Sequence, residues 1–248
     1  MGSMKKKAGR FKRSEWIVRG VYALAGLLMG WLMGRRWLRQ LRFPQLRAVQ
    51  QGLQEKHGEV EAAFLAGRVQ QRYEELYAHR PLFRNPRVQV HINRNVLPAL
   101  ALYQVLVEQC GDRQRTLQEV QELLLQVLMS KGRLVMRLLQ HVPDPFAVLR
   151  RAVRLVNKAA FPAPAWDMTY LVDDGQVIAF EIHDCLYVNV LAAYGVPELA
   201  QIFCQVDDAL AANFPAGISW ERESTLARGG QCCDFRYARA PQMAGSEE

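Results

Sequence analysis

Residues 166–185, WDMTYLVDDGQVIAFEIHDC, decide the fold expected for this chain. Polar and apolar residues alternate over residues 167–172 and 176–185, on either side of Asp173-Asp174-Gly175. A period of two is typical of half-buried strands, and an Asp-Gly pair between two such runs favours a tight turn. The stretch therefore predicts an antiparallel hairpin.

A second pair of predicted strands follows, at residues 217–225 and 231–238, around Arg228-Gly229-Gly230. Residues 185–194 and 197–213, between the two pairs, have the pattern of helices. Two hairpins with helices between them predict an antiparallel α+β module.

Helical patterns fill the chain before the hairpins. The apolar run NVLPALALYQVLVEQC at residues 95–110 ends at Gly111, and Asp144-Pro145 is an N-cap followed by a first-turn proline. The expected fold is α+β, with an N-terminal membrane-associated helix, a helical middle region and a C-terminal antiparallel sheet of two hairpins packed with helices. The predicted divisions are a basic N-terminus with an anchor helix (1–42), a helical linker (43–80), the α+β domain (81–240) and a disordered tail (241–248).

The net charge of +8 is unevenly distributed. Residues 1–50 hold 12 Lys and Arg and one acidic residue, whereas residues 166–238 hold 11 acidic residues and three Arg. The basic residues flank an apolar run instead of covering a folded face, a pattern that favours attraction to anionic lipid over binding to nucleic acid. We therefore expect no nucleic-acid partner.

The apolar run GVYALAGLLMGWLMG, residues 20–34, carries no charge. As a helix it would be about 22 Å long, short of the ~30 Å hydrocarbon core, so it would either span the bilayer with snorkelling arginines or lie in the interface. We expect a membrane-associated chain with its domain on the cytoplasmic side. The residues expected at the membrane are Trp16, Arg19, Gly26, Gly30, Trp31, Gly34 and Trp37.

Glycines recur every four residues in this run, at Gly26, Gly30 and Gly34. Such a stripe lets two helices approach closely in lipid, although glycine is also common in membrane helices generally. The stripe makes a second copy of the chain, or another membrane protein, the expected partner beside anionic lipid.

The chain has five cysteines, an odd number without a CxxC pair. A disulfide framework is not expected in a chain this long and apolar, so we interpret the cysteines as reduced thiols in the cytoplasm. Cys110 and Cys232 are expected to pack as small hydrophobic residues.

Three chemically active side chains fall on one face of the predicted strand 176–185. Alternation places Glu181, His183 and Cys185 on one side and Ile178 and Phe180 on the other. Cys185 also precedes a helix, whose N-terminal dipole favours the thiolate. A face of this composition suits a site better than a solvated surface.

Two later elements add to that site. Cys204, Asp207 and Asp208 share a helical face at spacings of three and four residues, and Cys233 and Phe235 share a face of the last strand. We expect these side chains to line one pocket with Cys185. The alternative is that the cysteines simply pack in the core and the acids are solvated.

In order along the chain, these residues form a recognisable pattern. The segments HDC (183–185), GVPELAQIFCQVD (195–207) and TLARGGQCCDFR (225–236) resemble the C-terminal pattern of the L-2-amino-thiazoline-4-carboxylic acid hydrolase family. That pattern has a Cys after a strand, then Phe-Cys-x-x-Asp, then Thr-x-x-x-Gly leading to Cys-Asp-Phe-Arg. The positions in register are Cys185, Cys204, Asp207, Thr225, Gly229, Cys233, Asp234 and Phe235.

The resemblance implies a hydrolase that opens the C–N or C–S framework of a cyclic, amidine-like thiazoline and gives an N-carbamoyl cysteine. A membrane anchor would instead suit a lipid or another hydrophobic substrate. The catalytic residues expected are His183, Cys185, Cys204, Asp207 and Cys233. Those expected to bind substrate are Glu181, Asp208, Thr225, Arg228, Gly229, Gly230 and Phe235.

Two mechanisms stay open from the sequence. In one, a thiolate of Cys233 or Cys185 attacks, His183 serves as base or acid, and Asp207 orients or protonates. In the other, two or three of Cys185, Cys204 and Cys233, together with His183 or Asp207, hold Zn or Fe, and the metal activates water. A third possibility is a non-catalytic module that binds a lipid, a cofactor or a partner protein in the same pocket.

Overall fold

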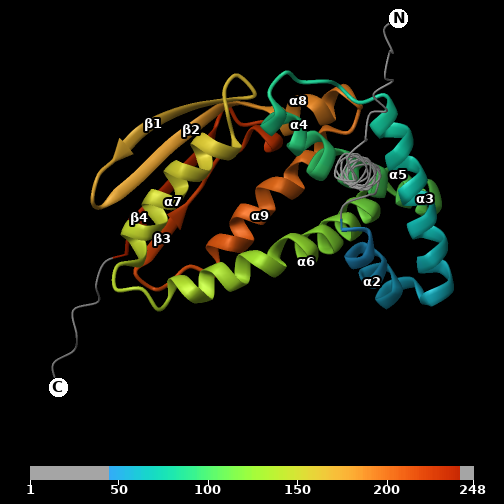
Figure 1. Ribbon diagram of the computed structural model, residues 1–248, viewed down its shortest axis with the longest axis horizontal. Helices are drawn as coiled ribbons and strands as arrows, with labels where there is room; N and C mark the ends of the chain where they lie inside the picture. The colour runs from blue at the N-terminus through green and yellow to red at the C-terminus, as the bar shows by residue number, and fades with distance from the viewer. Residues whose placement is uncertain (1–44, 241–248) are drawn as a thin grey trace, which may run out of the picture. The chain divides into compact units, whose positions relative to one another are not determined.

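The computed structural model describes residues 45–240 (Figure 1). Its α-helices are α2 (Leu46–His57), α3 (Glu59–Ala78), α4 (Pro86–His91), α5 (Leu97–Cys110), α6 (Arg113–Leu139), α7 (Pro145–Ala160), α8 (Leu186–Ala193) and α9 (Gln201–Ala211). Its strands are β1 (Trp166–Asp173), β2 (Val177–Cys185), β3 (Ile218–Glu221) and β4 (Cys233–Arg239). A π-helical turn, Ile92–Val96, joins α4 to α5, and short 3₁₀ turns cover Pro197–Ala200 and Leu226–Arg228.

The helix ends follow the local signals. Gly111 ends α5 in the left-handed conformation, with φ of 72°, and the Asp144 carboxylate caps α7 by accepting the Ala147 N–H at 2.9 Å. The predicted helical linker 43–80 forms two helices instead of one. The break falls at Gly58, whose φ of 81° disfavours any residue with a Cβ.

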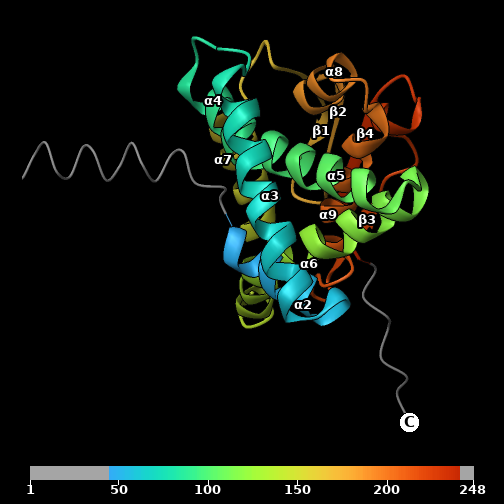
Figure 2. The ribbon, with the colours of Figure 1, turned by 90° about the vertical axis from the view of Figure 1, so that its right-hand side faces the viewer.

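Helices α2, α3, α5 and α6 pack together in one helical layer, which faces the viewer in Figure 2. Leu53 of α2 and Leu65 and Tyr73 of α3 are fully buried in the same hydrophobic cluster as Leu100 and Tyr103 of α5. Helix α5 is apolar on all sides because it is the centre of this layer. The segment 45–78 therefore contributes to the domain core.

The strands form one antiparallel sheet of order β1-β2-β4-β3. The two hairpins predicted from the sequence join through the β2–β4 pair, in which Phe180 lies opposite Phe235 and Ile182 opposite Cys233. These four side chains are buried on the inner face of the sheet. The predicted α+β fold, mostly helical with a C-terminal antiparallel sheet, is confirmed.

Helix α7 packs on the inner face of the sheet, and α9 lies between α7 and α6 in the view of Figure 1. Phe146 and Leu149 of α7 pack on Ile178 and Ile218 in a small second cluster. Helix α9 packs on α6 and has only one buried residue, Ile202. A helix that lies inside the domain and yet stays partly exposed on most sides borders open space.

The predicted membrane association is wrong on the residues described. Nowhere within 45–240 is a helix both long and apolar enough to cross a bilayer. The segment 20–34 that motivated the prediction lies outside the described residues, as do the glycine stripe, its flanking Trp and Arg residues, and the tail 241–248.

Candidate functional site

A β-bulge in β2 changes which side chains reach the site. Asp167 of β1 pairs with Asp184, but the next residue of β1, Met168, pairs with Ile182. His183 is therefore the extra residue, with no partner on β1. A bulge interrupts the alternation of faces along a strand, so the pattern that held up to Ile182 does not continue beyond it.

The predicted shared face of Glu181, His183 and Cys185 is wrong because of this bulge. Cys185 lies opposite the buried Trp166 and packs against the main core. Glu181 and His183 stay on the outer face, where Oε2 and Nε2 lie 3.2 Å apart and the His183 side chain is 42% exposed. The structure thus separates the expected histidine and glutamate from the thiols.

Three thiols come together from three different elements. Cys185 ends β2, Cys204 lies on α9 and Cys233 begins β4. Cys185 raises the pKa of both Cys204 and Cys233 by electrostatic interaction, and Cys233 raises that of Cys204, so the three thiols lie near one another. The Cys233 Sγ also accepts the Leu226 N–H at 3.2 Å. We refer to Cys185, Cys204, Cys233 and Asp207 as the thiol site.

Burial holds these thiols in their neutral form. It raises the pKa of Cys204 to about 12 and that of Cys233 to about 11. The pKa of Cys185 is also raised by burial, but the Tyr187 and Val188 N–H groups at the start of α8 and the Trp166 indole oppose the rise. Cys185 is thus a half-buried thiol at a helix start, where two backbone N–H groups favour its anion.

A buried arginine holds the acidic pair of α9. The Arg222 guanidinium, only 2% exposed, lies 3.1 Å from the Asp207 carboxylate and 2.6 Å from that of Asp208. It also donates to the Cys204 carbonyl at 2.7 Å. Arg222 was not among the predicted residues, since its partners lie 14 to 18 positions away and no local spacing marks it.

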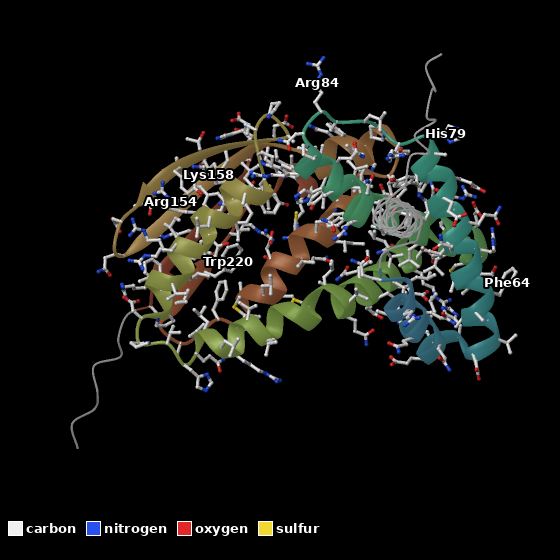
Figure 3. The ribbon with its side chains drawn as sticks, viewed as in Figure 1. Phe64, His79, Arg84, Arg154, Lys158 and Trp220 are labelled. Atoms are coloured by element: carbon white, nitrogen blue, oxygen red, sulfur yellow. The ribbon has the colours of Figure 1, made fainter. Side chains whose placement is uncertain are left out.

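Asp207 is desolvated although part of its side chain is exposed. Burial raises its pKa to about 6, against the opposing effect of Arg222, and yet 43% of its side chain is exposed. Cys185 and Cys204 are likewise half-buried, and Trp220 is seen between α7 and α9 in Figure 3. Three side chains of the thiol site are therefore partly exposed, and Cys233 is buried.

The turn that follows β3 positions Cys233. Thr225 is buried, and its Oγ1 has no hydrogen-bond partner among the described residues. Gly229 has a φ of 84°. A Cβ on Gly230 would collide with Ser224 Oγ and lie 3.1 Å from the Thr225 carbonyl. The glycines thus serve the close turn that delivers the Leu226 N–H to the sulfur. Arg228 is exposed at the tip.

Phe235, predicted to bind substrate, is part of the packing of the sheet. Its ring stacks on Phe180 with centroids 4.8 Å apart and planes 9° apart, and the Arg222 guanidinium lies 5.3 Å from its centroid. Through this contact Phe235 supports the arginine that holds Asp207 and Asp208.

The predicted metal ligands do not form a metal site. Across residues 45–240, no three His, Cys, Asp or Glu side chains are grouped closely enough to hold an ion. His183, which would complete the set with the three cysteines, lies on the other face of the sheet. These residues do not fit a bound Zn or Fe.

A family model, that of L-2-amino-thiazoline-4-carboxylic acid hydrolase, matches residues 89–237. The chain belongs to this family. No curated protein sequence matches the chain. Among solved structures, the Fe(II) unliganded H-NOX protein of K. algicida is 13% identical, covering 81% of this chain and 97% of its own, with a TM-score of 0.37. A mutant H-NOX protein of S. oneidensis is 13% identical over 79% and 94%, with a TM-score of 0.35. TM-scores this low do not establish a common fold.

The residues matched by the family model also contain a buried polar cluster. The sequence patterns did not reveal this cluster. His91 Nδ1 lies 2.6 Å from Tyr187 Oη, and the Asn95 amide donates to the same hydroxyl at 2.9 Å. His91 Nε2 lies 2.8 Å from the Ala160 carbonyl. These contacts join positions 69 to 96 residues apart, so only the folded chain brings them together.

Proposed function

We propose that this member of the amino-thiazoline carboxylate hydrolase family is a thiol-dependent hydrolase acting on a carbon bonded to nitrogen and sulfur. The observation that carries the proposal is the gathering of Cys185, Cys204, Cys233 and Asp207 from three elements at one partly exposed site. Thiols with an adjacent ionisable carboxyl group are the parts that nucleophilic attack and leaving-group protonation require.

Cys185 is the proposed nucleophile. It is half-buried and so can meet a substrate, whereas Cys233 is buried. Cys185 also lies at the start of α8, where N–H groups favour its thiolate and lower its pKa against the effect of burial. The more strongly raised pKa values of Cys204 and Cys233 suit neutral thiols that surround the reacting atoms.

The reaction proposed for a 2-amino-thiazoline carboxylate begins at the ring carbon between nitrogen and sulfur. The Cys185 sulfur forms a bond to this carbon as its proton passes to a base. The bond from the carbon to the ring sulfur then breaks, and that sulfur takes a proton. The product of this first step is an isothiourea that joins the opened substrate to Cys185.

Water completes the cycle by adding to the same carbon. Its oxygen becomes the carbonyl oxygen, one of its protons goes to nitrogen, and the other restores the acid. The bond from Cys185 to carbon breaks, and the sulfur regains its proton from the base. The released compound is an N-carbamoyl cysteine, and one water is consumed in each turnover.

Asp207 is the proposed acid for the departing sulfur. A pKa of about 6 keeps part of its population protonated near neutral pH and lets it recover a proton from water. Its contact with Arg222 fixes the carboxyl group without removing that capacity, because burial outweighs the arginine.

The test is hydrolysis of 2-amino-thiazoline-4-carboxylate by purified variants. We expect Cys185→Ala and Asp207→Asn to lower kcat by about 10²-fold or more. Cys232→Ala, at the cysteine that directly precedes β4, is the matched control and keeps wild-type turnover. Full activity in Cys185→Ala would contradict the proposal.

A binding module is the second candidate, favoured by one observation. Burial raises the pKa of all three site thiols, as in a neutral pocket that holds a ligand without reacting. For this candidate, calorimetry would detect stoichiometric binding of the thiazoline without turnover, and Cys185→Ala would bind as the wild type does.

A further inference from the structure

We propose that His91 and Tyr187 together form the base of the thiol site: Tyr187 takes the proton of Cys185 and passes its own proton to His91. The proposal rests on the proposed function, in which Cys185 attacks and its base is unassigned. The histidine expected from the sequence, His183, cannot serve because it lies on the outer face of the sheet.

The hydrogen-bond partners fix where the protons lie. The Ala160 carbonyl can only accept, so His91 Nε2 at 2.8 Å must carry a proton. Burial lowers the pKa of His91, so the ring is neutral and Nδ1 carries a lone pair, with the Asn95 amide 3.3 Å away. Tyr187 Oη, 2.6 Å away, therefore donates to Nδ1. The Asn95 amide fills one acceptor position of the same hydroxyl.

This arrangement can take up one proton without creating a buried phenolate. As the Cys185 S–H bond breaks, a new O–H bond forms at Tyr187, and the original O–H proton moves to His91 Nδ1. The electron pair left on sulfur makes the new bond to carbon, and the positive charge ends on an imidazolium hydrogen-bonded on both sides. Reversal of the same steps returns the proton when Cys185 leaves.

The position of Tyr187 connects the pair to the thiol. Cys185 is the N-cap of α8 and Tyr187 is its second residue. The tyrosine ring stacks on Phe203 of α9, one position before Cys204, with centroids 4.3 Å apart. Trp166 lies opposite Cys185 in the β1–β2 pair, and its ring centroid is 5.7 Å from that of Tyr187. The thiol and the phenol therefore adjoin the same indole, and the proposed transfer runs through one water between them.

The surroundings of His91 isolate it from solvent. The rings of Phe161, Trp166 and Tyr187 lie 5.2, 4.7 and 5.7 Å from the imidazole centroid, and the residue is 9% exposed. No acidic side chain is hydrogen-bonded to it in the described part of the chain; its polar neighbours are Asn95, Tyr187 and the Ala160 carbonyl. A proton on this ring therefore comes by way of Tyr187.

The backbone at this point is also unusual. His91 is the last residue of α4, and the next five residues, Ile92–Val96, form a π-helical turn that contains Asn95. π-Helical turns occur frequently at functional sites. This turn brings both His91 and Asn95 to the Tyr187 hydroxyl group. A contact that only packed apolar side chains would not need two hydrogen-bonding partners at this position.

The experiment measures the alkylation rate of Cys185 by iodoacetamide from pH 5 to 10, with peptide mass spectrometry to separate it from the other thiols. We expect Tyr187→Phe to slow alkylation at pH 7 by at least about tenfold and to move the profile to higher pH. His91→Phe keeps an aromatic ring and should give the same loss. The double variant should lose no more than either single one, since one relay is broken in each case.

Tyr194→Phe, the same substitution at the other end of α8, is the matched control and should follow the wild-type profile. A wild-type profile in Tyr187→Phe or in His91→Phe would overturn the proposal. Thiazoline turnover is measured in parallel. Absent turnover with a Tyr187-dependent alkylation profile would reject the proposed substrate and retain the relay, whereas normal turnover with an unchanged profile would reject the relay alone.

A measurement on the unmodified protein keeps the proposal testable if a variant fails to fold. ¹⁵N NMR of histidine-labelled wild-type protein at pH 7 should show His91 as the neutral tautomer protonated at Nε2. Protonation at Nδ1, or a charged ring at this pH, would overturn the proposed direction of transfer.

Discussion

At the scale of single residues, Asp207 combines a raised pKa with an exposed position. Its folded-state pKa of about 6 lies above the ordinary aspartate value of 3.8, so the folded state binds this proton more tightly than the unfolded state does. The stability gained from this proton is complete below about pH 3.8 and is lost as pH rises through about 6.

The free energy of unfolding of Asp207→Asn, relative to that of the wild type, should therefore increase progressively between pH 4 and pH 7. Urea unfolding at several pH values measures this difference in free energy of unfolding. Asp144→Asn serves as the control: the Asp144 pKa is lowered, chiefly by hydrogen bonds from Arg239 and Ala147, so its difference should stay constant from pH 5 to 7. A constant difference for Asp207→Asn would show that its carboxyl group is not desolvated.

The residues that local spacing selected and those it missed differ in one physical respect. Cys204, Asp207 and Cys233 carry reactive groups at helical or strand spacing, so their shared location could be predicted. Arg222 and His91 reach the site only through contacts across the fold, with partners up to 96 positions away. Nothing in the neighbouring sequence marks such contacts.

At the scale of elements, the turn signals predicted the strands of the sheet. They gave no indication of the bulge in β2. Asp-Asp-Gly at 173–175 and the segment around Arg228 lie between the strands as expected. His183 looked like a regular strand residue because a bulge adds one position without changing composition. That single extra residue moved Cys185 to the inner face and left His183 outside.

The turn between β3 and β4 gives a prediction at this scale. Gly230→Ala should lower the free energy of unfolding by about 1–3 kcal/mol, because its Cβ would meet Ser224 Oγ and the Thr225 and Cys232 carbonyls. Gly175→Ala, in the β1–β2 turn, has nothing within 4 Å of the new Cβ and is the matched control. Equal stability of the two variants would contradict the close packing inferred for this turn.

At the scale of the whole molecule, the described chain has a core shared by its helical layer and its sheet. One cluster runs from Leu53 and Leu65 through Leu100 to Phe180 and Cys233. The predicted domain boundary near residue 80 stays a prediction, but the packing of α2 and α3 has a measurable consequence.

Leu65→Ala on α3 should destabilise the domain by about 2–5 kcal/mol, as expected for a fully buried leucine. Because the core is continuous, loss of helical circular dichroism and exposure of the buried Cys233 thiol to a thiol reagent should occur at one denaturant concentration. Val60→Ala, on an exposed position of the same helix, should change little. Two separate transitions would show that α2 and α3 unfold independently of the sheet.

Covalent attachment of substrate to Cys185 tests the central claim most directly. The protein is mixed with 2-amino-thiazoline-4-carboxylate, quenched in acid and digested, and its peptides are examined by mass spectrometry. The account predicts that the peptide containing Cys185 gains the mass of one intact substrate, since no atom is lost before water enters, and that Tyr187→Phe accumulates less of this adduct. An adduct on Cys204 or Cys233 alone, or turnover in Cys185→Ala, would contradict it.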